Sequence, residues 1–194
     1  SIAASVLILS NCQTPGGSQH STNYDPPAYR PSSPSRVSVK VSTGKQAVYV
    51  MEGSRVLMAT PCSVGTAKDP TPKGNFTIYK KHFDKRRISS PGAGYPMTYW
   101  CEFAPAYGLH WGFVKPYPCT HGCIRMPKWS AAKFFNLVSP GTPIHIAASQ
   151  PEDATVGASL PVLDDTTLPD PPLSYLHSPQ VFEDAKYKGA MFAD

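Results

Sequence analysis

Residues 120–126 read Thr-His-Gly-Cys-Ile-Arg-Met, and a second histidine, His110, stands shortly upstream in the segment Gly-Leu-His-Trp-Gly at 108–112. Cys123 lies between a glycine and an apolar residue, with two imidazoles nearby in the sequence. This combination supplies a thiol nucleophile, a candidate base and unhindered backbone N–H groups that could hold an oxyanion. The stretch therefore predicts an active site built on an activated cysteine.

The same stretch resembles the signature of the L,D-transpeptidase catalytic domain, found in the YkuD-like enzymes of bacterial cell walls. That signature is Ser/Thr-His-Gly-Cys followed two residues later by Arg or Asn, and residues 120–125 match it throughout. Further segments are similar to the family at 64–65, 71–78 and 141–146. The loop 111–119 between His110 and Thr120 is shorter than in the family, which affects the expected substrate cleft more than the reaction class.

Alternating apolar and polar residues dominate the middle of the chain. Residues 37–41 alternate strictly, and after a turn at 42–45 the pattern continues through 46–51 and 55–60, which predicts a β-meander. Further strands are expected at 76–79, 97–103 and 142–146, and one helix from about Pro127 to Val138. We expect a mainly β, sandwich-like or barrel-like domain with one principal helix after the catalytic turn.

The chain of 194 residues, 41% of them hydrophobic, is long enough for one sizeable core. We place the catalytic domain at 36–149. Residues 1–12 resemble an export signal whose end, Leu-Ser-Asn-Cys, is similar to a lipobox, so Cys12 is a candidate for lipidation. The alternative is a frayed apolar N-terminus. Residues 13–35, rich in Pro and Ser, are expected to form a tether.

Charge is unevenly distributed. Residues 36–149 hold 15 Lys and Arg against 4 Asp and Glu, whereas 150–194 hold 2 against 8. The Pro-rich acidic end is expected to be an extended C-terminal tail, with a short helix at its end or docking onto the basic core as alternatives. A basic domain favours an anionic partner such as wall polymer, a membrane surface or nucleic acid. The run 80–87 is broken by Asp84 and matches no nucleic-acid motif, so we expect a solvated face there, or a rim that attracts wall polymer, and no nucleic-acid binding.

The resemblance implies roles for the catalytic residues. Cys123 is the expected nucleophile and His110 its base, oriented by the backbone carbonyl of Trp111 in place of a carboxylate. Gly122 permits a sharp turn, and the N–H groups near Gly122 and Cys123 are the expected oxyanion donors.

Roles in substrate binding are expected for four residues. His121 lines the family's site, and Arg125 can pair with a substrate carboxylate through its planar fork; a hydrogen-bonded turn histidine and a bracing arginine are the alternatives. Trp111 and Tyr117, on the short loop, are candidates for the walls of the cleft. The glycine-rich residues 91–95 form a surface loop, or alternatively a flexible lid.

The implied reaction is acyl transfer on peptidoglycan stem tetrapeptides, with release of the terminal D-Ala and 3-3 cross-linking through a thioester. It requires no cofactor and no metal. Alternatives are L,D-carboxypeptidase activity on the same stems, a non-catalytic wall-binding module, and a zinc site of Cys119, His121, Cys123 and His110. We expect an exported monomer in the periplasm or cell envelope, with a lipid anchor if Cys12 is modified.

Three further cysteines, Cys62, Cys101 and Cys119, have no role in this chemistry. In an oxidising compartment one pair, with Cys101 and Cys119 favoured, could form a disulfide. The alternative, which we prefer, is that all three are small buried apolar residues.

Overall fold

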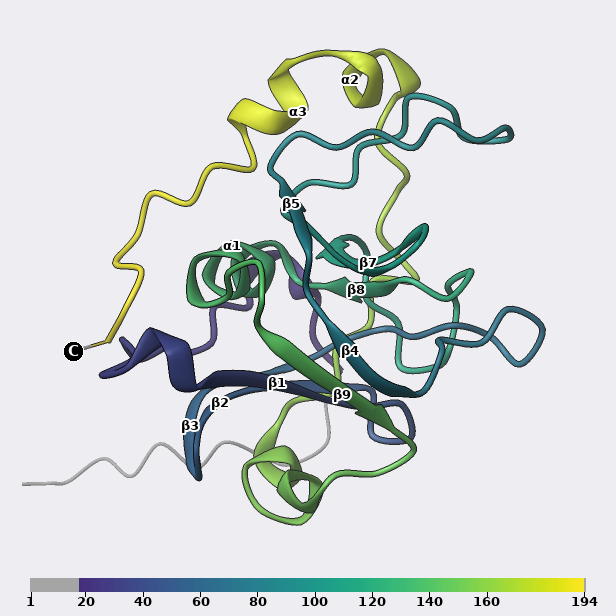
Figure 1. Ribbon diagram of the computed structural model, residues 1–194. Coiled ribbons are helices and arrows are strands. Elements are labelled where there is room, and N and C mark those ends of the chain that lie inside the picture. The colour runs from purple at the N-terminus through teal and green to yellow at the C-terminus, as the bar shows by residue number, and fades with distance from the viewer. Residues whose placement is uncertain (1–17, 194) are drawn as a thin grey trace, which may run out of the picture.

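The computed structural model describes residues 18–193. The predicted export signal with Cys12, and residues 13–17 of the predicted tether, lie outside the described part. Two sheets share one hydrophobic core with helix α1, Lys128–Leu137 (Figure 1). The first sheet has the order β3-β2-β1-β9-β4, with strands Arg55–Pro61, Ala47–Glu52, Val37–Ser42, Pro143–Ala147 and Gly74–Thr77. The second has the order β5-β6-β7-β8, with strands Lys80–His82, Trp100–Ala104, Tyr107–Trp111 and Ile124–Met126.

The predicted fold class is confirmed. Strands β1, β2 and β3 form the antiparallel meander, because the alternation at 37–41 places Val37, Val39 and Val41 in the core. Helix α1 begins after Pro127 and ends at Leu137, as its pattern predicts. Strand β9 then returns to pair parallel with β1 and antiparallel with β4, which closes the first sheet.

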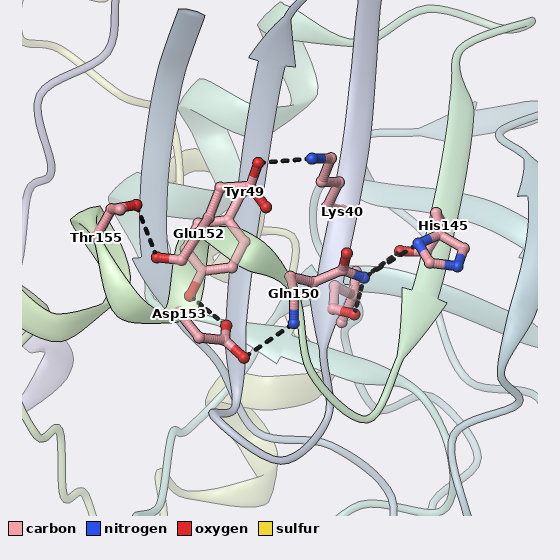
Figure 2. A network of polar contacts seen from close by, with 8 residues as sticks. Lys40, Tyr49, His145, Gln150, Glu152, Asp153 and Thr155 are labelled. Atoms are coloured by element: carbon pink, nitrogen blue, oxygen red, sulfur yellow. Dashed lines mark hydrogen bonds and ion pairs between the residues drawn. The ribbon is translucent and has the colours of Figure 1, made fainter. Parts of the chain in front are cut away.

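Strand β2 is buried along its whole length, so both faces of the sheet are covered. The outer cover consists of two 3-10 helices, η3 (Pro151–Ala154) and η4 (Val156–Ser159). Figure 2 shows the attachment of η3: the Tyr49 hydroxyl donates to the Asp153 carboxylate at 2.7 Å, and Lys40 pairs with Glu152 at 2.5 Å. Residues just beyond the predicted catalytic domain thus complete the packing of the first sheet.

The C-terminal segment differs from the extended conformation expected for it. It forms α2 (Leu173–His177) and α3 (Gln180–Glu183), which lie beside the loop 83–97 that follows β5 (Figure 1), as in the alternative of a docked segment with a short helix. Four of its apolar side chains are buried, namely Leu163, Leu176, Val181 and Ala185, whereas Val162 and Leu173 are exposed. Acidic, Pro-rich composition rules out a separate core, but a handful of apolar residues is sufficient to dock a segment onto a core that already exists.

The described part of the tether, residues 18–35, also differs from expectation, because it packs against the domain. Asp165 accepts hydrogen bonds from the Ser21 N–H and hydroxyl, at 2.7 and 2.6 Å, and also from the Val114 N–H at 2.8 Å. Ala28 is fully buried and forms a bridge with Met58 of β3. One buried carboxylate therefore joins three distant segments of the chain, which composition alone does not reveal. Among the described residues, no helix has both the length and the apolar character to cross a bilayer.

Candidate active site

The central feature of the site is the parallel pairing of β7 with β8, which places His110 opposite Arg125. Cys123 immediately precedes β8, at the end of the turn that begins at Thr120. The imidazole of His110 and the thiol of Cys123 consequently line one cavity of about 460 Å³. The sequence predicted neither strand, because β8 has three residues and β7 contains a glycine, Gly108.

His110 is held in one tautomer. Its side chain is buried, and Nδ1 lies 2.6 Å from the backbone carbonyl oxygen of Trp111. Since a carbonyl oxygen can only accept, Nδ1 must carry the proton and Nε2 is left unprotonated. Burial, together with the charge of Arg125 and against the opposing effect of the Trp111 hydrogen bond, lowers the pKa of the imidazole to about 4. His110 is therefore neutral near pH 7, with Nε2 able to accept a proton.

The Cys123 thiol is half-buried, and its sulfur lies 3.7 Å from the backbone carbonyl of Ala106. Burial raises the thiol pKa above its ordinary value. A hydrogen bond from the Gly108 N–H and the charges of Arg125 and Arg87 act in the opposite direction without cancelling that rise. The thiol and the imidazole are thus both neutral at rest, and such a thiol becomes a strong nucleophile only when a base removes its proton.

Hydrogen bonds fix the conformation of the turn formed by residues 120–123. The Thr120 hydroxyl donates to the Cys123 carbonyl at 2.6 Å and accepts from the Gly122 N–H at 3.1 Å. From the other side, the Thr71 hydroxyl donates to the Gly122 carbonyl at 3.0 Å. The Gly122 N–H, one of the expected oxyanion donors, is thereby occupied in this structure. The Cys123 N–H has no partner within residues 18–193 and is the better candidate.

The part of the chain that contains these site residues matches a known protein family. The sequence model of the L,D-transpeptidase catalytic domain matches residues 36–146, more than half of the chain. The chain belongs to this family. Among curated protein sequences, none matches the chain significantly.

Solved L,D-transpeptidases share the fold. One from Mycobacterium smegmatis has 24% identity and a TM-score of 0.52, over 58% of this chain and 59% of that one. One from Stackebrandtia nassauensis has 20% identity and a TM-score of 0.53, over 64% and 60%. A fragment of the enzyme from Xylanimonas cellulosilytica has 24% identity and a TM-score of 0.52, over 61% and 65%. The matched region spans about three fifths of the length of these structures.

Within this L,D-transpeptidase domain, two of the four expected substrate-binding residues line the cavity, His121 and Arg125. His121 is largely exposed and pairs with Asp69 at 3.0 Å. Asp69 is distant from the motif in sequence, and its only sequence signal is its position two residues before the family-like segment 71–78. The Arg125 side chain packs over Gly112, where an added Cβ would lie 2.8 Å from its Cδ.

The other two expected residues, Trp111 and Tyr117, do not line the cavity. Successive side chains of a strand point to opposite faces, so Trp111 faces away from the side that His110 occupies. Its ring packs against the core and lies 5.5 Å from the Lys128 ammonium. Tyr117 lies two residues after Lys115, whose N–H donates to the Ser63 hydroxyl at 2.8 Å. The Tyr117 side chain is exposed.

Most residues of one wall of the cavity were not identified from the sequence. The loop between β5 and β6 and the start of β6 supply it, through Lys85, Arg86, Arg87, Tyr95, Met97, Trp100 and Glu102. The Trp100 ring is buried and also packs on His110, with ring centroids 5.7 Å apart.

The zinc alternative fails on geometry. Within residues 18–193, no three His, Cys, Asp or Glu side chains are grouped so that they could hold a metal ion. The four cysteines of this part, Cys62, Cys101, Cys119 and Cys123, are all free thiols, and Cys62 and Cys101 are buried. The Cys101–Cys119 disulfide is therefore absent from the structure.

Gly122→Ala is expected to lower both stability and activity. Gly122 has φ of +101°, and an added Cβ would lie 2.4 Å from Cε1 of Tyr107. Gly141→Ala is the matched control, because Gly141 has the same φ and open space around it. We expect Gly141→Ala to cost about 1–2 kcal/mol through backbone strain, and Gly122→Ala about 1–3 kcal/mol more through overpacking. Urea denaturation of both variants measures the difference, and equal costs would contradict the close packing described here.

Proposed function

We propose that this domain is a cysteine-dependent acyl transferase that acts on peptidoglycan stem tetrapeptides. The observation that carries the proposal is the 2.6 Å hydrogen bond between His110 Nδ1 and the Trp111 carbonyl, in a cavity that also holds Cys123. It leaves an unprotonated Nε2 in the same cavity as a thiol whose pKa is raised by burial. A base is then required in the site, and no carboxylate is needed to orient it.

In the first half-reaction, the Cys123 thiol gives its proton to His110 Nε2, and the sulfur attacks the carbonyl carbon of the third stem residue. The Cys123 N–H stabilises the oxyanion that forms on the carbonyl oxygen. The carbon–nitrogen bond to the terminal D-Ala then breaks, and the leaving nitrogen takes the proton from His110. A thioester between Cys123 and the third residue remains.

In the second half-reaction, an amine on the third residue of another stem attacks the thioester carbonyl. His110 takes a proton from the attacking nitrogen and returns it to the Cys123 sulfur, which regenerates the thiol and gives a 3-3 cross-link. Water in place of the amine gives a tripeptide, which is the L,D-carboxypeptidase outcome. Such a substrate places the protein in the cell envelope, where the predicted lipid anchor at Cys12 would hold it.

Product analysis tests the proposal. Purified protein is incubated with disaccharide-tetrapeptides, and the products are separated and weighed by mass spectrometry. Dimers joined through their third residues, together with free D-Ala, support the transpeptidase, and tripeptides alone indicate the carboxypeptidase. If the substrate remains unchanged, the result would instead favour a non-catalytic wall-binding module.

The pH dependence of the two reacting groups is a separate prediction. The thiolate fraction of Cys123 grows only as pH rises through a raised pKa, so alkylation by iodoacetamide should have its midpoint above the ordinary thiol value of about 8.5. The imidazole stays unprotonated down to about pH 4, so the acidic limb of kcat/KM should lie near pH 4 and not near the ordinary histidine value of about 6.5.

Peptide mapping of the alkylated protein follows Cys123 separately from the other thiols. A plateau of Cys123 alkylation at and below pH 7 would contradict the neutral pair, because it would indicate a thiolate stabilised by an imidazolium.

A further inference from the structure

The charge run 80–87 is divided by the structure into residues with different partners. The Lys81 ammonium donates to the carbonyls of Phe135 and Val138, at 2.5 and 2.7 Å, and so caps the end of α1. Lys85, Arg86 and Arg87 instead line the active-site cavity. The run is therefore not a uniform solvated face.

Arg86 is the anchor of this wall. Its guanidinium donates to the carbonyls of Gly94, Leu176 and Ser178, at 2.6, 2.7 and 2.9 Å, and lies 4.6 Å from the centroid of the Phe182 ring. These contacts join the loop 83–97 to the segment that carries α2 and α3 (Figure 1). Arg86 is thus committed to backbone acceptors, two of which, in Leu176 and Ser178, lie outside the family-matched residues, and it is a positioning residue.

Lys85 and Arg87, which flank this anchor, keep donors available. The Lys85 ammonium lies 5.3 Å from the Trp100 ring centroid, and within residues 18–193 it has no hydrogen-bond acceptor. Arg87 donates from Nε to the Ser89 hydroxyl at 2.9 Å, and its two terminal nitrogens have no acceptor in the same part of the chain. Arg87 is also close enough to Cys123 to favour its thiolate.

The cavity contains one carboxylate to balance these cations, Glu102, and it is already bound. It accepts from Trp100 Nε1 at 3.0 Å and from the Tyr79 hydroxyl at 2.9 Å. Burial tends to raise the pKa of Glu102, but these hydrogen bonds lower it below its ordinary value, so the group is ionised. With Lys85, Arg86, Arg87 and Arg125 against Glu102, the wall of the cavity is net positive.

We propose that Lys85 and Arg87 recognise a free carboxylate of the substrate stem next to the reacting carbonyl, and that Arg86 holds their loop in position through the C-terminal segment. The inference rests on the proposed function. A guanidinium fork beside an ammonium, in a partly enclosed cavity, fits a planar carboxylate better than a neutral amide. The carboxylate could belong to the second residue, to the side chain of the third, or to the terminal D-Ala.

The test compares acylation of wild-type protein by an all-acid tetrapeptide and by three analogues, each amidated at one of these carboxylates. Rates of thioester formation are measured by intact mass at several substrate concentrations. We expect one amidated analogue to react roughly 10- to 100-fold more slowly in kcat/KM, the loss typical of a charged hydrogen-bonded contact. That analogue identifies the carboxylate.

Variants then assign the preference to the loop. In Arg87→Gln and Lys85→Gln the ratio of acid to amide rates should fall toward one, and Arg87→Lys should restore part of it. Arg86→Gln should also reduce the ratio, while iodoacetamide still alkylates Cys123 at the wild-type rate. Lys80→Gln removes the same charge from an exposed position outside the cavity and should keep the full preference.

Equal rates for the acid and all three amide stems would overturn this inference and leave the proposed function standing. A preference that survives in Arg87→Gln and Lys85→Gln would do the same. Failure of every stem to acylate wild-type protein would instead count against the proposed function itself.

Discussion

Cys123→Ala is expected to abolish turnover of stem tetrapeptides, with a loss of at least about 10⁴-fold in kcat. The reason is that alanine retains the packing of the turn and removes the atom that would carry the acyl group. The hydrogen bonds that shape the turn join the hydroxyls of Thr120 and Thr71 to the backbone, so they do not depend on the sulfur. Product formation and D-Ala release, measured beside the thermal midpoint of unfolding, check the prediction.

Cys119→Ala is the matched control for this variant. Cys119 is a half-buried free thiol four residues upstream, and it does not line the cavity. We expect it to keep near wild-type turnover. Residual turnover above a few per cent in Cys123→Ala, in a folded protein, would show that another group forms the covalent bond or that none forms.

His110→Gln is expected to lower kcat/KM by about 10²- to 10⁴-fold, the usual contribution of a general base. Glutamine is polar and of similar size, but its side-chain amide cannot accept the thiol proton near neutral pH. The loss should appear in acylation itself, measured as the rate of thioester formation in single turnovers.

Two further measurements separate loss of the base from damage to the fold. Alkylation of Cys123 by iodoacetamide at high pH should persist in His110→Gln, because hydroxide in the solvent then removes the thiol proton. His145→Gln, on β9 and outside the cavity, should retain activity. A His110→Gln variant with wild-type acylation rates would contradict the base assignment.

The parts of the fold that were predicted from the sequence are those with a strong local signal. The meander follows from the alternation of residues 37–41 and its continuation, and α1 follows from apolar residues at helical spacing between Pro127 and Gly141. The pair His110 and Cys123 was identified from the motif, and the structure places both in one cavity. These features depend on residues close together in the chain.

The remaining features depend on contacts between distant segments. Asp165 buries its carboxylate among donors from Ser21 and Val114. The segment around Asp165 is therefore docked onto the domain, although its composition favours disorder. The cleft wall formed by 83–97 depends on Arg86 reaching carbonyls some 90 residues away, such as that of Leu176. From the sequence alone, the run 80–87 could not be divided into the residue that caps α1, the residue that anchors the loop and the residues that line the cavity.

Trp111 and Tyr117 lie outside the cavity for a related reason. Trp111 and Tyr117 lie near the histidine in sequence, but strand alternation turns Trp111 away from the cavity. Trp100 and Glu102, on the neighbouring strand β6, are nearer to His110 in space than their sequence separation indicates. Sequence proximity to a motif is a poor guide to the walls of a cleft formed between strands.

The most direct test of the central claim is the intact mass of the protein, acid-quenched within the first turnovers on a stem tetrapeptide. We expect a mass increase equal to the stem without its terminal D-Ala. Peptide mapping should place it on Cys123, and hydroxylamine should remove it as expected for a thioester. Cross-linked product that accumulates with no covalent adduct at any quench time, or an adduct that maps to another residue, would contradict it.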